Sequence, residues 1–240
     1  SVPQGRILAV PLVKLDWRPM SWFARGLDVR ELTSHRGTLY RLPQLNPGDP
    51  DAPILPNFDI RIDKLAIRDL TIAKGLAGPE AHKANLLASA DIRDGRAMVR
   101  ADGRLGRFDR LHVLVDAEPD GDRFDLELDY LAPRGGVIAA LLDADAGFRA
   151  RVFGDGGWSK WNGGGYVTRD GANFAAFRMT NAAGRYTIVG QARPQPALSE
   201  GLLRDALGAV VSYKATGTLA NSVLEGGVQL IGRGVSGSAR

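Results

Sequence analysis

A strict alternation of apolar and acidic residues limits the possible folds of this sequence more than any other feature. The segment FDLELDY (124–130) has apolar or aromatic residues at every even position and carboxylates at every odd position. A repeat of two residues is typical of a β-strand with one buried face and one solvated face. The same alternation recurs in LHVLVDA (111–117) and GRYTIVG (184–190). The sequence therefore predicts a mainly β protein.

The segment FDIRIDKLAIRDLTI (58–72) alternates in the same way but skips one residue twice. The apolar phase shifts at Asp63-Lys64 and again before Leu70. A shift of one residue inside an alternating run is the signature of a β-bulge, which bends and twists a strand. We therefore expect a long, bent strand with two bulges here.

Turn and helix signals separate these runs. Asp-Gly pairs between alternating segments predict antiparallel hairpins, because both central residues of a type I′ turn need positive φ. Such pairs begin at Asp94, Asp102, Asp120, Asp155 and Asp170. About three short helices are expected, at 18–26, 133–144 and 196–210.

Three short helices cannot cover a sheet of this size, so its apolar face has to be buried in another way or remain open. A closed barrel is one possibility. The bulges and the irregular strand spacing favour a long, curved and twisted antiparallel-type sheet, a half-pipe or β-taco with an apolar concave face. We expect residues 1–240 to form one continuous β-rich segment, with a possible sub-boundary at the proline-rich loop 43–56, because its prolines oppose central-strand pairing.

The alternation also predicts which side chains form the apolar wall. These are Phe58, Ile60, Ile62, Leu65, Ile67, Leu111, Val113, Val115, Phe124, Leu126, Leu128 and Tyr130. The glycine-rich stretch FGDGGWSKWNGGGYV (153–167) predicts a sharp structural corner between strands, with its tryptophans packed against the wall. The residues of this corner are Trp158, Trp161, Gly163, Gly164 and Gly165.

Composition and motifs argue against several classes of function. The chain has no cysteine, and its formal net charge of +4 comes from basic residues that alternate with acidic ones, a pattern that speaks against nucleic-acid binding. The three histidines lack metal-ligand spacing, and neither a phosphate-binding loop nor a catalytic constellation is present. We therefore expect no enzyme, no metal and no cofactor. The sequence contains no apolar run of the ~20 residues that a membrane span needs. Because the chain begins at Ser1 without an initiating Met and ends at Arg240 within a repeating pattern, we expect an excerpt of a longer protein.

Five segments in this order and spacing resemble the N-terminal to middle part of the TamB family, within the wider AsmA-like group. They are VKLDWRPMSWFARGLDVRELTSHRGTLYRLP (13–43), LPNFDIRIDKLAIRDLTI (55–72), PRGGVIAALL (133–142), GDGGWSKWNGGGYV (154–167) and LLRDAL (202–207). TamB is the translocation and assembly module subunit, and the resemblance covers nearly the whole chain.

The resemblance implies the periplasmic portion of a protein that is anchored in the inner membrane, although this segment lacks the anchor. It also implies a half-pipe lined with apolar side chains that carries phospholipid between the inner and outer membranes and supports outer-membrane protein assembly. The implied partners are phospholipid, outer-membrane protein clients and the outer-membrane barrel protein TamA, which would be met by parts of the chain not present here. The wall residues would then line a lipid groove.

Two other functions remain open from the sequence. A chaperone-like scaffold would bind client β-strands by edge augmentation. A glycan-binding or glycan-processing β-sandwich would use Trp158 and Trp161 with Asp155 and Asp170, provided that the two carboxylates face each other across a cleft.

Overall fold

The computed structural model describes residues 7–24, 26–41, 58–76, 78–157, 159–182, 185–194, 205, 207–220, 223–232 and 236–239. About 70% of the chain is in strands and 5% in helices. The strands are β1 (Leu8–Ala9), β2 (Leu12–Trp17), β3 (Gly26–His35), β4 (Thr38–Leu39), β5 (Asp59–Ile72), β6 (His82–Arg93), β7 (Arg96–Leu105), β8 (Asp109–Glu118), β9 (Arg123–Ala132), β10 (Phe148–Gly156), β11 (Lys160–Arg169), β12 (Ala172–Ala182), β13 (Arg185–Ala192), β14 (Val211–Ala220), β15 (Val223–Ile231) and β16 (Ser236–Ala239).

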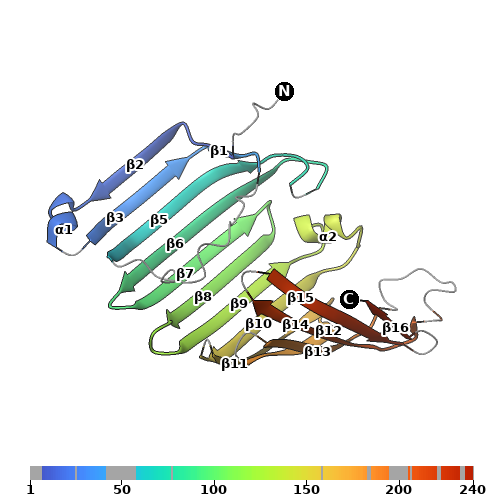
Figure 1. Ribbon diagram of the computed structural model, residues 1–240. Coiled ribbons are helices and arrows are strands. Elements are labelled where there is room, and N and C mark those ends of the chain that lie inside the picture. Colours follow the sequence, from blue (N-terminus) through green and yellow to red (C-terminus); the bar gives the residue numbers. More distant parts are fainter. Residues whose placement is uncertain are drawn as a thin grey trace.

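All of these strands belong to one curved sheet that does not close, which confirms the predicted fold class (Figure 1). From β5 to β16 each strand pairs antiparallel with the next one in the sequence. In Figure 1 the sheet from β2 to β9 is seen face-on, whereas β11 to β16 are seen nearly edge-on. The sheet therefore bends along its length instead of lying flat.

One end of the sheet differs from the antiparallel arrangement that the sequence predicts. Strands β3 and β4 follow one another along β5, and both pair with it in parallel. Parallel neighbours need a crossover connection of about a dozen residues or more, and the segment 40–58 has that length. The sheet is therefore mixed, and β2 lies outside β3 at this end.

The two predicted bulges are confirmed in β5. The pairing of β5 with β6 shifts register between Ile62 and Leu65 and again between Ile67 and Leu70. Asp69 has a φ of 54°, which is the left-handed conformation. The inserted residues restore the apolar side chains of both halves of β5 to one face.

The hairpin predictions were partly correct. Asp94-Gly95 (φ 51° and 74°) and Asp170-Gly171 (φ 48° and 82°) form tight turns with positive φ at both residues, and the pair at 120–121 lies in the turn between β8 and β9. The prediction was wrong for Asp102-Gly103, which lies inside β7. Gly103 serves there as a strand residue opposite Leu111, so the dipeptide alone did not determine a turn.

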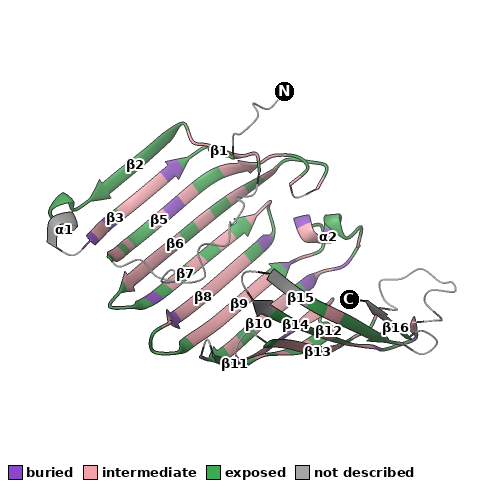
Figure 2. Cartoon of the chain, in the orientation of Figure 1, coloured by how far each residue is buried: buried purple, intermediate pink, exposed green. Residues whose placement is uncertain are grey.

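Two of the expected helices are present in short form, as α1 (Pro19–Ala24) and α2 (Val137–Leu141). Most of the third, 196–210, lies outside the described residues, as does the proposed sub-boundary at 43–56. Figure 2 shows that β5 to β9 are mostly of intermediate burial, with only scattered buried positions. The small core cluster of Ala132, Ala139, Ala146 and Phe148 lies where α2 covers the ends of β9 and β10.

Candidate functional site

The strand register gathers the predicted wall residues on one face of the sheet, which we call the apolar face. One row across five strands consists of Ile62, Ala90, Val99, Val115 and Leu126. The next row consists of Leu65, Ala88, Ala101, Val113, Leu128 and Val152. Neither row contains a charged or polar side chain. Successive strands thus continue one uncharged surface across the sheet.

Strand register places eleven of the twelve predicted wall residues on this face, and the twelfth, Phe58, lies just before β5. Phe58 precedes β5 and is 42% exposed, whereas the other eleven are half-buried. These eleven are Ile60, Ile62, Leu65, Ile67, Leu111, Val113, Val115, Phe124, Leu126, Leu128 and Tyr130. None of the twelve is fully buried, so the wall is an open surface and not the dry interior of a closed barrel.

Helix α2 closes one side of the apolar face, and Asp109 holds it there. The Asp109 side chain is only 1% exposed. Its Oδ1 accepts a hydrogen bond from the backbone N–H of Val137 at 3.0 Å, and its Oδ2 accepts one from the N–H of Ile138 at 3.1 Å. A carboxylate at the first turn of a helix satisfies donors that have no partner within the helix. A Cβ at Gly136 would lie 2.0 Å from Asp109 Oδ1, so this close approach requires glycine.

Tyr130 is one of the wall residues and also contacts Asp109, the residue that holds α2. Its hydroxyl donates a hydrogen bond to Asp109 Oδ2 at 3.1 Å, and its ring packs against the core cluster beneath α2. Burial, reinforced by the negative charge of Asp109, raises the pKa of the Tyr130 phenol well above its usual range. Tyr130 therefore remains a neutral donor and marks the border of the apolar face.

Trp161 closes the opposite side of the face. Its side chain is 4% exposed, and its Nε1 donates a hydrogen bond to the backbone carbonyl of Phe124 at 2.9 Å. The indole lies across two glycines, because a Cβ at Gly154 or Gly163 would come within 2.1 or 2.2 Å of the ring. The ring centroids of Phe124 and Trp161 are 6.0 Å apart. Trp161 thus packs against the wall, at the end of β9 away from α2.

The predicted corner is smaller than expected. The turn itself spans 157–159 between β10 and β11, where the Ser159 N–H and hydroxyl both donate to the Asp122 carboxylate. Gly163, Gly164 and Gly165 lie inside β11 and not at the turn, which corrects their assignment as corner residues. Trp158 lies outside the described residues.

The same pairing of an aromatic ring with a glycine occurs twice more on the apolar face. A Cβ at Gly165 would come within 2.8 Å of the Phe177 ring, and one at Gly190 would come within 2.5 Å of the Tyr213 ring. In each case the ring and the glycine are direct cross-strand partners. A ring that covers a strand glycine shields the backbone that the missing side chain leaves bare. Sequence reasoning missed these pairs, because they depend on register.

Between α2 and Trp161 the apolar face is open. From Gly154 to Phe148 the distance along β10 is roughly 20 Å at the usual rise of a strand. The middle of this span carries Leu126, Leu128 and Val152, half-buried and in register with one another. The site is therefore an uncharged strip of the sheet that runs across the strands between α2 and Trp161, and we call this strip the trough.

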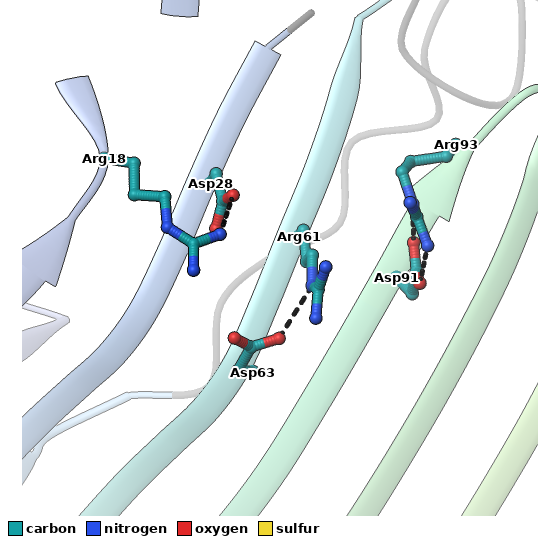
Figure 3. A network of polar contacts seen from close by, with 6 residues as sticks. All are labelled: Arg18, Asp28, Arg61, Asp63, Asp91 and Arg93. Atoms are coloured by element: carbon teal, nitrogen blue, oxygen red, sulfur yellow. Dashed lines mark hydrogen bonds and ion pairs between the residues drawn. The ribbon is translucent and has the colours of Figure 1, made fainter. Parts of the chain in front are cut away.

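The opposite face, which we call the polar face, carries alternating ion pairs. Arg149 Nε lies 3.1 Å from Asp129 Oδ1, and Arg96 Nη2 lies 2.6 Å from Asp116 Oδ2. Hydrogen bonds from these guanidiniums lower the pKa of Asp129 and of Asp116 below the usual range. Figure 3 shows the same pattern near β3, β5 and β6, where each of three arginines lies against a carboxylate. This face is solvated, as the alternation predicts.

The glycan-processing alternative requires two facing carboxylates, and the structure does not bring Asp155 and Asp170 together. Asp155 pairs with Asn162 near the start of β11, and Asp170 follows the last residue of β11. Asp170 Oδ1 already accepts the Gly147 N–H at 2.8 Å. In the part of the chain that the structure describes, no cluster of three or more carboxylates or histidines could hold a metal ion.

Asp109 is the functional residue that the sequence analysis overlooked. Its signal was present, because it occupies the apolar phase of β8, where Leu111, Val113 and Val115 follow. A carboxylate in that phase has to find buried donors. The donors come from α2, whose position against β8 only the fold supplies.

The class of protein that this geometry indicates is an open β-sheet whose apolar trough is bordered by α2 and Trp161. Among the described residues no group of side chains could hold a metal ion. Comparison with known proteins finds no matching family model, no matching curated protein and no matching solved structure. Among the described residues, no helix is both long and apolar enough to span a bilayer.

Proposed function

We propose that this chain is a non-enzymatic segment of a lipid-conducting groove, in which acyl chains of phospholipids lie along the apolar trough. The observation that carries this proposal is the unbroken, half-buried apolar surface between α2 and Trp161, which no other part of the described chain covers completely. A contiguous apolar face that remains accessible to solvent is typical of a site for an apolar partner.

The physical argument is one of transfer free energy. Moving a methylene group from water onto an apolar wall gains ~0.8 kcal/mol. A lipid tail leaving a bilayer gains little, because it exchanges one apolar environment for another. Rows such as Val115–Leu126 and Val113–Leu128 can therefore accept tails without trapping them, and the headgroup can remain in water. Such passage needs no nucleophile, metal or cofactor.

The resemblance to TamB supports a specific setting for this groove. In that setting the segment belongs to the periplasmic portion of a protein anchored in the inner membrane. It would bridge toward the outer membrane, aid assembly of outer-membrane proteins and meet TamA through other parts of the chain. Lipid binding is the first of these properties to test.

The test compares one substitution on each face of the sheet. Leu128→Asp places a carboxylate between Val113 and Val152 in the trough. Val189→Asp is the matched control, because Val189 lies on the polar face between Arg178 and Lys214 and is 41% exposed. Native mass spectrometry of each purified chain, followed by solvent extraction, measures bound phospholipid.

We expect phospholipid on the parent chain and on Val189→Asp, and at least a tenfold loss on Leu128→Asp with its circular dichroism unchanged. A lipid-free parent chain would contradict the groove. Unfolding of Leu128→Asp alone would mean that the trough acts as a core, so Val115→Ser provides a milder second variant. Transfer of a fluorescent phospholipid between vesicles then tests conduction itself.

Strand augmentation is a second candidate because of the edge at β2. In the described part of the chain β2 pairs on one side only, with β3, and its Leu12, Val13 and Leu15 are 67%, 51% and 51% exposed. An apolar edge strand can receive a further strand. A photocrosslinker at Lys14 should capture client strands if this function holds, whereas crosslinks to lipid alone would count against it.

A further inference from the structure

A depression of about 960 Å³ lies over β5 to β10. Its charged lining residues belong to the polar face, because they alternate with the wall residues along each strand, although Ile67 and Leu111 of the wall also border it. Its floor includes Leu87 and Leu131, which are 50% and 39% exposed although they point to the polar face. The depression thus combines apolar and charged groups.

The acidic residues of the depression are already held by basic ones. Asp129 pairs with Arg149, and Glu127 pairs with Arg151 at 2.6 Å. Asp102 Oδ1 lies 2.8 Å from His112 Nδ1. The carboxylates that line this region therefore leave little charge for any additional cation.

Three arginines of the depression have no such partner. Arg68, Arg104 and Arg110 are exposed, and no ion pair of the described residues includes them. Arg104 and Arg110 are moreover direct cross-strand partners in β7 and β8. Like charges in that position destabilise a sheet, so an anion that lies between them would relieve the repulsion.

The other end of the same face shows that this protein does pair its arginines. Arg18, Arg61 and Arg93 contact Asp28, Asp63 and Asp91, respectively (Figure 3). The chain carries a formal net charge of +4. Arg68, Arg104 and Arg110 bring three positive charges to one depression.

We propose that this depression docks the protein on an anionic phospholipid surface, with a headgroup phosphate between Arg104, Arg110 and Arg68. Guanidinium forks match the oxygens of phosphate and bind them with charge-assisted hydrogen bonds. The glycerol and the first acyl carbons of the lipid would cover Leu87 and Leu131. A free phosphate ion would leave both leucines in water and fill only a small part of the depression.

The test measures binding of the purified chain to phosphatidylcholine vesicles with and without phosphatidylglycerol. Arg104→Gln/Arg110→Gln removes the opposed pair and should not impair folding, because it relieves repulsion. Each basic residue near an anionic membrane contributes on the order of 1 kcal/mol, so we expect about a 30-fold weaker affinity for the anionic vesicles.

The matched control is Arg61→Gln/Arg93→Gln, which removes the same charge from the same face at a place where each arginine already has a partner. We expect no more than about a twofold loss for this variant. Equal losses for the two double variants would mean that net charge alone drives binding, and this result would overturn the site. So would equal affinity of the parent chain for neutral and anionic vesicles.

Two further measurements distinguish a lipid headgroup from a free phosphate ion, and binding at the depression from binding at the trough. We expect Leu87→Ser to weaken vesicle binding and inorganic phosphate to compete only weakly with vesicles. If phosphate competes strongly and Leu87→Ser has no effect, the site binds a free phosphate ion. The inference does not rest on the lipid groove, so Leu128→Asp should bind anionic vesicles like the parent chain. Loss of binding in that variant would assign the vesicle contact to the trough instead.

Discussion

The two halves of the apolar face are built from different chemistry. Across β5 to β9 the face consists mainly of aliphatic side chains, with Gly103 as the one glycine among its strand positions in that described region. Across β10 to β14, glycines alternate with aromatic rings, and Trp161, Phe177 and Tyr213 each cover a glycine. The side chains of the first half are half-buried. In the second half Trp161 is buried, at 4% exposure, whereas Phe177 and Tyr213 are half-buried like the wall residues.

This difference explains how one sheet can have an accessible apolar surface in its middle and a packed aromatic residue at its border. An aliphatic side chain stands up from the pleat and fills its own position. A glycine leaves a gap that a neighbouring ring can cover by lying across it. Trp161 is the clearest case, because it packs on Gly154 and Gly163 and donates a hydrogen bond to the backbone carbonyl of Phe124. At this border the side chain is therefore buried, whereas the wall residues beside it are half-buried.

The largest effect is expected for Trp161→Ala. Removal of this buried indole uncovers two strand glycines and should lower the free energy of unfolding by about 3–5 kcal/mol. Urea unfolding followed by circular dichroism measures the loss. Trp17→Ala is the comparison, since Trp17 is 39% exposed on the edge strand β2, and we expect it to cost less than about 1 kcal/mol. Similar losses for both would mean that the burial of Trp161 over two glycines adds no stability beyond that of an exposed tryptophan.

Asp109→Asn tests the opposite border. The amide retains one acceptor oxygen, but its NH₂ group faces a backbone N–H of α2, so one buried donor loses its partner. We expect a loss of about 2 kcal/mol together with faster hydrogen exchange at Val137 and Ile138. The control is Asp145→Asn, because the Asp145 side chain is 87% exposed. Unchanged exchange in the Asp109 variant would show that α2 is held mainly by its apolar contacts.

One substitution made in both halves compares them directly. Gly163→Ala introduces a Cβ that would lie 2.2 Å from the Trp161 ring and 2.7 Å from the backbone oxygen of Phe153, so both the indole and the backbone have to shift, at a cost of about 1–3 kcal/mol. Gly103→Ala introduces the same atom on the aliphatic half, where its nearest neighbour, Leu111 Cβ, is 3.5 Å away. That variant should be neutral or slightly more stable, by ~0.5 kcal/mol. Thermal unfolding of both variants measures the difference.

The smallest effect on stability is expected for the ion pair of Asp129 and Arg149, which joins β9 and β10 on the polar face. Arg149 lowers the pKa of Asp129 through a hydrogen bond, so this pair stabilises the fold above the unfolded-state pKa and loses its effect as the pH falls through the folded-state value. Asp129→Asn should therefore cost ~0.5 kcal/mol at neutral pH, and progressively less as the pH falls below the ordinary aspartate pKa of about 3.9 toward the lower folded-state value. Urea titrations across this range measure both values. A constant difference at every pH would mean that packing, not charge, is responsible.

Much of this architecture could be predicted from periodicity. The alternation in FDLELDY assigned Leu126 and Leu128 to the apolar face, and the two phase slips located both bulges of β5. The glycine-rich stretch was harder, since residues 163–165 are strand residues and only 157–159 make the turn. The parallel pairing of β3 with β5 left no local signal, because it depends on where a long connection returns.

The sequence by itself determined which side chains share a face, because in a β-strand successive residues point to opposite sides whatever the strand pairs with. Only the tertiary structure decided which of those side chains meet. Register set Trp161 over Gly154 and Arg104 opposite Arg110, and the return of the chain after β9 set the first turn of α2 over Asp109. A shift of one position in register would have turned the side chains of a strand to the other face and broken the contacts across the strands.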